Sequence, residues 1–265
     1  MQFMIIRKAD AATEALLPPA PELIEDMTRF NAQFADEGRL GLALGLRPSA
    51  HAVRIKLWPG GSSVTDGPFA ETKELVAGFT IIEAASKQAA IEQVRGWPVR
   101  DADATGEVVL ELRETGCPGG CAEVAAGMAD NGNDSDNGAG RYVILLRSDD
   151  DAERDTVPPR HKLDALDAFN AAELAAGVLL AGDGLMSSAR GARIRIGAGG
   201  AGAGGVSVMD GPFAEAKELI AGFWMIRAAS MDDAIAWARK LPYPTGPEVD
   251  VEIREVLTMD ELIGT

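Results

Sequence analysis

The chain has 265 residues, a formal net charge of −16 at pH 7 and a hydrophobic share of 46%. This length allows one large domain or two small ones, and the hydrophobic share excludes a disordered acidic tail. No apolar run approaches the roughly 20 residues that span a bilayer, and Met1 to Asp10 lacks the layout of a signal peptide. The acidic balance argues against binding to a phosphate backbone, so we expect a cytoplasmic protein without membrane or nucleic-acid partners.

The first half of the chain predicts six elements in the order strand, helix, strand, strand, helix, strand. They are a strand over 3–7, a helix through Ile24, Met27 and Phe30, strands over 53–57 and 78–83, a helix capped by Ser86 and a strand over 108–112. The first run is apolar on both faces, as in a central strand, while 53–57 alternates apolar and cationic residues. The three helical residues recur at i, i+3 and i+6, which places them on one face.

The second half repeats this pattern. The hexapeptide DGPFAE at 66–71 returns at 210–215, and 16 of the 21 aligned positions from Asp66 to Ser86 are identical. Phe30-Asn31 returns as Phe169-Asn170. Residues 116–140 are rich in Gly, Asn, Asp and Ser, which predicts a flexible linker. The chain therefore divides into module 1 (1–115), the linker (116–140) and module 2 (141–265).

The predicted element order in each module is β-α-β-β-α-β, the ferredoxin-like pattern. Helices in this pattern cover one face of the sheet and leave the other bare. Two such modules in one chain can cover each other's bare faces. We therefore predict an α+β protein in which two ferredoxin-like modules form a fused pseudo-dimer, with a ligand site at the seam between them.

The segments DGPFAETKELVAGF and DGPFAEAKELIAGF closely resemble the signature of the YCII-related family, DGPF subgroup. The resemblance covers nearly the whole chain outside the linker, and it implies modules that pair into a dimeric α+β barrel. Some relatives carry a His–Asp pair proposed to be catalytic, and at least one is a dehydrochlorinase. Genes of DGPF proteins often neighbour those of extracytoplasmic-function sigma factors, which implies such a factor as a partner.

The resemblance places the family histidine at His161, early in the first helix of module 2; the matching residue of module 1 is Glu22. Asp183 and Asp210 are both candidates for its partner, and we take His161 with Asp183 as the candidate catalytic pair. Imidazole beside a carboxylate is a common general base because its pKa lies near neutrality. The simpler interpretation of His161 is an exposed residue in the first turn of a helix.

The DGPF segments also have two interpretations. Gly tolerates backbone angles that other residues avoid and Pro fixes φ, so each segment can be a rigid turn whose Phe69 or Phe213 enters the core. Alternatively, each segment forms one wall of a pocket, with Asp66 and Asp210 facing a ligand. Retention in both copies does not distinguish the two.

The cationic residues of the alternating strands are Arg54, Lys56, Arg193 and Arg195. If they meet the acidic residues of the closing strands between the modules, they form ion-pair networks. Otherwise they line a cationic pocket for an anionic ligand. Pairing is favoured because a buried charge without a partner is costly.

Two further motifs carry weaker signals. Cys117 and Cys121 lie in the linker and lack the additional ligands that zinc needs, so exposed thiols are favoured over a redox pair, and a metal site is least favoured. The GxGxxG run at 197–202 lies between two predicted strands rather than before a helix, which predicts a hairpin loop and not a nucleotide site. We expect neither a metal nor a cofactor.

The leading functional hypothesis is a pair of modules that binds a small molecule, with an anionic one as the candidate, at the interface. General acid–base catalysis on that molecule is a further option within this hypothesis. The alternative is a regulatory or interaction protein associated with a sigma factor, and a purely structural pseudo-dimer is third. The sequence leaves open whether the protein is an enzyme and whether the fused pair associates further.

Overall fold

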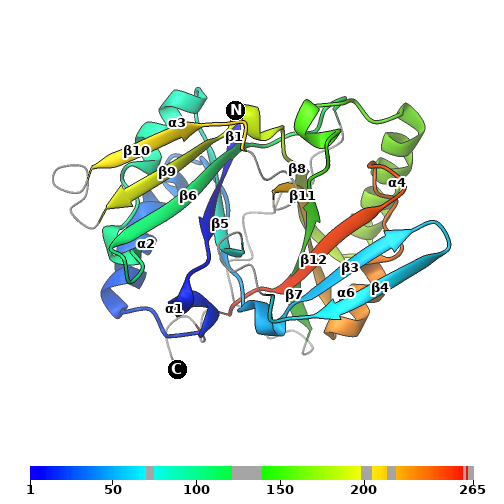
Figure 1. Ribbon diagram of the computed structural model, residues 1–265, viewed down its shortest axis with the longest axis horizontal. Coiled ribbons are helices and arrows are strands. Elements are labelled where there is room, and N and C mark those ends of the chain that lie inside the picture. The colour runs from blue at the N-terminus through cyan, green and yellow to red at the C-terminus, as the bar shows by residue number, and fades with distance from the viewer. Residues whose placement is uncertain (70–74, 121–138, 198–204, 214–218, 259–260, 262–265) are drawn as a thin grey trace.

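The computed structural model describes residues 1–69, 75–120, 139–197, 205–213, 219–258 and 261, and it consists of two six-stranded antiparallel sheets (Figure 1). The elements of module 1 are β1 (Gln2–Lys8), α1 (Ala11–Glu14), α2 (Pro21–Ala35), β2 (Leu40–Gly45), β3 (Val53–Trp58), β4 (Gly61–Asp66), β5 (Val76–Glu83), α3 (Lys87–Val94) and β6 (Glu107–Glu114). Those of module 2 are β7 (Gly140–Arg147), α4 (Arg160–Ala175), β8 (Leu179–Gly184), β9 (Ala192–Gly197), β10 (Val206–Asp210), β11 (Ile220–Ala228), α6 (Met231–Ala238) and β12 (Val249–Glu255).

Each sheet contains strands from both modules. The strand orders are β10-β9-β6-β1-β5-β2 and β4-β3-β12-β7-β11-β8. The β3–β4 hairpin of module 1 therefore extends the sheet of module 2 by pairing with β12, and the β9–β10 hairpin pairs with β6 in return. The two halves of the molecule therefore exchange hairpins. In Figure 1, β3 and β4 lie at the right beside β12, and β9 and β10 lie at the left beside β6.

The predicted fold class is confirmed, with one correction to the strand assignment. The second strand of each ferredoxin-like core is β2 or β8, which pairs with β5 or β11, and not the alternating strand at 53–57. Leu40–Gly45 reads LGLALG, which lacks a polar alternation because Gly or Ala takes every second position. The alternating strand belongs to the exchanged hairpin instead.

The apolar runs that predicted central strands do form them. Strand β1 lies between β5 and β6, and β7 lies between β11 and β12. Phe3, Met4, Ile5 and Ile6 are fully buried because helices cover one face of the sheet and the second sheet covers the other. Burying such side chains contributes about 1.5–3 kcal/mol each.

The helix ends follow their local sequence signals. Ser86 and Ser230 cap α3 and α6, accepting hydrogen bonds from the backbone N–H groups of Ala89 and Asp233. Gly177 has a φ of +71° directly after the end of α4, a conformation that glycine adopts without strain.

The two sheets pack against each other through an apolar layer supplied by both modules. Its buried members are Met4, Ile6, Leu42, Leu46, Val76, Phe79, Ile81, Val143, Leu145, Ala181, Leu185, Ile220, Phe223, Met225 and Val256. Phe79 and Phe223 meet there with ring centroids 5.1 Å apart. This layer gives the fused pair its barrel-like arrangement, and it fills the seam where the sequence placed the ligand site.

Candidate functional site

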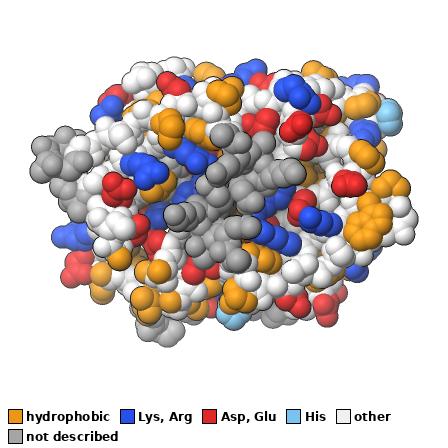
Figure 2. All heavy atoms as spheres, viewed as in Figure 1, with side chains coloured by type: hydrophobic (Ala, Val, Ile, Leu, Met, Phe, Trp, Pro, Cys, Tyr) orange, Lys and Arg blue, Asp and Glu red, His pale blue; other side chains and the backbone are white. Residues whose placement is uncertain are grey.

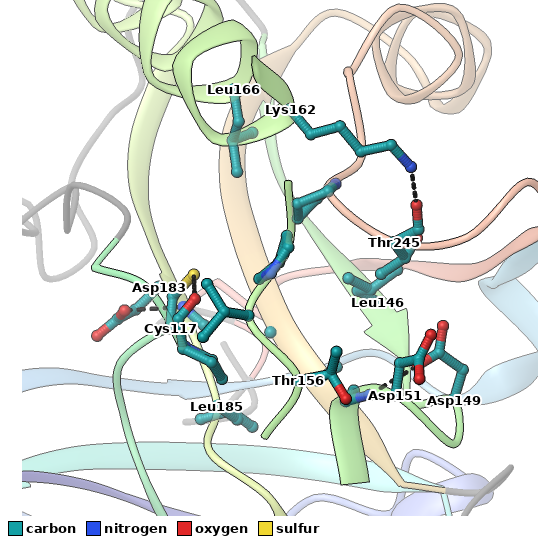
Figure 3. A pocket seen from close by; sticks show the side chains of 18 of the residues that line it. Cys117, Leu146, Asp149, Asp151, Thr156, Lys162, Leu166, Asp183, Leu185 and Thr245 are labelled. Atoms are coloured by element: carbon teal, nitrogen blue, oxygen red, sulfur yellow. Dashed lines mark hydrogen bonds between the residues drawn. The ribbon is translucent and has the colours of Figure 1, made fainter. Parts of the chain in front are cut away.

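A cavity of about 300 Å³ lies inside module 2 (Figure 3). It sits between helix α4 and the edge of the sheet, and the loops after β7 and α6 complete its wall. Leu146, Leu166, Leu185 and Trp224 contribute its apolar surface. A mainly apolar concavity with a few polar groups is the usual form of a small-molecule site. The cavity is therefore the candidate functional site, and it lies within one module rather than at the seam.

Helix α4 supplies one wall of the cavity. Lys162, Leu166 and Asn170 recur every four residues, which places them on one face of the helix, and all three line the cavity. Leu163 and Leu166 of the same helix are buried. Lys162 and Asn170 belong to no sequence motif described above except the Phe-Asn pair, whose repetition in both copies was a signal for Asn170.

The opposite wall is the edge strand β8, covered by the start of the linker. The N–H of Gly116 donates to the carbonyl oxygen of Gly184 at 2.9 Å. A Cβ atom at Gly184 would lie only 2.8 Å from the Gly116 oxygen, so this close approach requires glycine. Cys117 lines the cavity, is half-buried and is disulfide-bonded, which corrects its interpretation as an exposed linker thiol; Cys121 lies outside the described residues.

Two buried polar atoms in the cavity wall lack hydrogen-bond partners. Asn170 is 6% exposed, and its side-chain oxygen Oδ1 accepts no hydrogen bond from the residues that the structure describes. The hydroxyl oxygen of Thr245 is also buried and has no partner among these residues. The backbone oxygen of Thr245, in contrast, accepts a hydrogen bond from Lys162 Nζ. A buried polar atom without a partner costs about 1–3 kcal/mol, so both atoms favour a bound donor.

Three carboxylates line the cavity. Asp183 lies beside Cys117 at one end, while Asp149 and Asp151 lie near Thr156 at the other (Figure 3). Oδ1 of Asp183 accepts from the N–H of Gly184, and Oδ1 of Asp149 accepts from that of Ala152, each at 2.8 Å. Asp151 is largely exposed and pairs with Arg154 at 3.2 Å. The carboxylates outnumber the one cationic lining residue, Lys162.

Arg7 fills the corresponding place in module 1. It lies 139 positions before Leu146, the offset that relates the first strands of the two copies. Its guanidinium is 2.7 Å from both Asp10 and Asp101, and Trp97 Nε1 donates to Asp101 at 2.8 Å. Burial disfavours the charge of Arg7, but the two carboxylates outweigh this and raise its pKa. An ion-paired arginine thus occupies in module 1 the position at which Leu146 lines the cavity in module 2.

The structure separates the candidate catalytic pair. Asp183 lines the cavity, but His161 is exposed and does not, because this turn of α4 directs Lys162 inward instead. His161 is thus an exposed residue in the first turn of α4, as in the simpler of its two interpretations. A catalytic role for His161 stays a prediction that the geometry does not support.

The DGPF segments form tight turns at the ends of β4 and β10. A Cβ at Gly67 would lie 1.7 Å from the Ser49 carbonyl oxygen, and one at Gly211 would lie 1.9 Å from that of Ser188. Both Gly–Pro bonds are cis, and Phe69 and Phe213 are each 8% exposed. These features match the rigid-turn interpretation.

The carboxylates of the DGPF segments do not line the cavity. Asp66 and Asp210 are exposed, and Asp210 pairs with Lys87 of module 1 at 2.6 Å. Their proposed contact with a ligand therefore has no counterpart in the described site.

The cationic strand residues pair with acids, as the sequence favoured. Hairpin exchange brings β3 beside β12 and β9 beside β6. The resulting ion pairs are Arg54–Glu252 at 3.0 Å, Lys56–Asp250 at 3.9 Å, Arg193–Glu111 at 3.3 Å and Arg195–Glu107 at 3.4 Å. The guanidiniums of Arg54 and Arg193 also lie over the rings of Phe69 and Phe213, at 4.1 and 4.5 Å. These cations stabilise the exchanged hairpins and do not line the cavity.

Each exchanged hairpin covers a buried ionic cluster. Glu111 is fully buried and lies 3.2 Å from Lys8, 3.2 Å from Arg113 and 3.3 Å from Arg193. Burial alone would raise its pKa, but the three cations lower it from 4.5 to about 2. Glu252 lies in an equivalent cluster on the other sheet, and its pKa is lowered for the same reason.

Comparison with known proteins agrees with this two-module architecture. The model of the YCII-related domain matches residues 1–112 and again 140–260, so the chain belongs to the YCII-related family. The chain is 34% identical over 73 residues to "Uncharacterized protein R00369" of Rhizobium meliloti (strain 1021). That match covers 28% of this chain and 59% of the relative.

The described residues contain neither a membrane-spanning helix nor a cluster of metal-binding side chains. No described helix has the length and apolar character that crossing a membrane requires. Within the same residues, no three His, Cys, Asp or Glu side chains are grouped to hold a metal ion. Lys and Arg side chains are interspersed with Asp and Glu over the face in Figure 2.

Proposed function

We propose that module 2 binds a small organic molecule in the cavity beside α4, and that module 1 does not. The observation that carries this proposal is the mainly apolar cavity itself, which the buried Asn170 lines. Oδ1 of Asn170 has no partner among the described residues; the same holds for Oδ1 of Asn31 in module 1, so the cavity and not the oxygen distinguishes the modules. A ligand that donates a hydrogen bond to the Asn170 oxygen would remove the cost of leaving it unpaired.

The difference between the modules supports the assignment to one of them. In module 1 the Arg7 side chain fills the corresponding space and is held by Asp10 and Asp101. In module 2 Leu146 leaves that space open. Of the three carboxylates that line this site, Asp183 is our candidate for any proton transfer to or from the ligand.

The test uses benzyl alcohol, a neutral probe with one donor, followed by NMR at the Asn170 side-chain amide. Leu146→Arg should abolish binding, because the new side chain can fill the cavity and pair with Asp149 as Arg7 pairs with Asp10. Leu174→Arg is the control: it makes the same change at an exposed position of α4. Equal binding by wild type and Leu146→Arg would contradict the proposal.

We further infer, from the twice-repeated DGPF segment, that the chain falls in the DGPF subgroup of its family. The association with a sigma factor stays a prediction, and a pull-down with a genomically adjacent sigma factor tests it.

A further inference from the structure

We propose that the ligand of the module 2 cavity carries a guanidinium or ammonium group, which occupies the position that the Arg7 guanidinium takes in module 1. This inference rests on the proposed function of the cavity. It comes from a comparison of the two copies, which differ at the cation and agree in the groups that surround it.

The carboxylate that holds Arg7 is retained in module 2. Asp10 and Asp149 are 139 residues apart, the offset that also relates Arg7 to Leu146. In both copies Oδ1 accepts from the backbone N–H three residues later, that of Thr13 at 2.9 Å or of Ala152 at 2.8 Å. The two side chains are therefore held in the same way by their own loops.

The second oxygen of each carboxylate has a different neighbour. Oδ2 of Asp10 accepts from Arg7 Nη2 at 2.7 Å. In module 2, Leu146 offers no polar atom at this position, and Asp149 forms no ion pair with any residue that the structure describes. A half-buried carboxylate that lines a cavity without a counter-ion favours a cationic ligand.

The other acceptor of Arg7 is also matched. Asp101, which accepts from Arg7 Nε, lies in the segment after α3, and Thr245 lies in the matching segment after α6. The hydroxyl oxygen of Thr245 is buried and has no partner among the described residues. Module 2 thus keeps two acceptors around the vacated guanidinium position, and a ligand cation can bind both.

Lys162 does not take over the role of Arg7 at Asp149. Its ammonium donates to the backbone oxygen of Thr245, just as Arg7 Nη2 donates to the backbone oxygen of Asp101 in module 1. It therefore satisfies one backbone acceptor and leaves Asp149 Oδ2 and Thr245 Oγ1 for the ligand. The walls formed by Leu146, Leu166 and Trp224 accommodate an apolar body attached to the cation.

Three probes with the same butyl chain and a planar head group test the charge of the ligand: n-butylguanidinium, the neutral n-butylurea and the anionic pentanoate. Affinities are measured by NMR titration of the full-length protein. We expect n-butylguanidinium to bind at least about tenfold more tightly than n-butylurea, which corresponds to about 1.4 kcal/mol, and pentanoate to bind least. Asp149→Asn should remove this preference while keeping the Oδ1 hydrogen bond to Ala152.

Asp150→Asn is the matched control, because it changes the net charge equally in the same loop at an exposed residue that does not line the cavity. Equal affinity for the guanidinium and the urea, with both lost in Leu146→Arg, would overturn the charge assignment and leave the binding function intact. Failure of all three probes and of benzyl alcohol to bind would overturn both proposals.

Discussion

At the scale of single residues, the molecule keeps a duplicated polar framework and changes one side chain within it. Arg7 and Leu146 occupy equivalent positions, and the aspartate three residues after each accepts a hydrogen bond at Oδ1 from the backbone N–H three residues further on. One copy therefore supplies its own cation, and the other presents a cavity. The side-chain oxygens of Asn170 and of Asn31, its counterpart in module 1, both lack partners among the described residues, so this feature belongs to the retained framework. In module 2 the asparagine lines the cavity.

Replacing Asn170 by Leu should stabilise the protein and impair ligand binding. The substitution removes a buried acceptor that lacks a partner and fills the position with apolar volume, so we expect a gain of about 1 kcal/mol in the free energy of unfolding. Urea unfolding measures the gain, and the benzyl alcohol titration measures the lost binding. A loss of stability would show that Oδ1 is satisfied in solution, for instance by ordered water.

The buried carboxylate of Glu111 should make the protein sensitive to acid. Its pKa in the folded state is about 2, below its ordinary value of 4.5, so its stabilising contribution is present above about pH 4.5 and is lost as the pH falls towards 2. Glu111→Gln should lower stability by about 3 kcal/mol at pH 7 and flatten the acid dependence, because three cations lose their counter-ion.

Urea midpoints between pH 7 and pH 2 measure this effect. Glu25→Gln, on the exposed face of α2, is the control that should change neither the stability nor the acid dependence appreciably. An unchanged pH profile in Glu111→Gln would mean that other carboxylates control acid unfolding.

At the scale of elements, the hairpins that leave their own module dominate the architecture. The alternating pattern at 53–57 correctly predicted a strand with one cationic face. The acids on the closing strands were correctly favoured as the ion-pair partners of those cations. The pattern could not show which sheet the strand joins, because alternation specifies the face of a strand and not its neighbour. Strand β2 was missed because its alternate positions are Gly and Ala, so its sequence shows no polar alternation. A ligand site at the seam stays a prediction, whereas the cavity that the structure shows lies inside module 2. The sequence could not show this cavity because it depends on Leu146 lying opposite α4, a tertiary relation.

Gly67→Ala should destabilise the protein strongly, because the new Cβ would lie 1.7 Å from a backbone oxygen that cannot rotate away. We expect a loss of at least about 3 kcal/mol, the upper range for overpacking. Gly60→Ala provides the comparison: its φ is +89° and nothing lies within 4 Å, so only the backbone preference of about 1 kcal/mol is lost. Thermal unfolding of the two variants measures the difference, and equal losses would contradict a steric role for Gly67.

At the scale of the whole molecule, hairpin exchange makes the two modules one cooperative unit. Each sheet takes two of its six strands from the other module, and the apolar layer between the sheets contains residues of both. The buried acids Glu111 and Glu252 each contact cations from both modules. The linker therefore connects two halves that also depend on each other through hydrogen bonds, ion pairs and packing.

Cutting the linker should consequently leave the two halves associated. We expect a protein with a specific protease site introduced between residues 121 and 138 to elute as one species after cleavage, because separation would expose the apolar layer and break the β3–β12 and β6–β9 pairings. Size-exclusion chromatography in native buffer and in denaturant compares the states. Two separate peaks in native buffer would mean that each module keeps its own hairpin in solution, since only a module with a complete sheet of its own could stay folded after release.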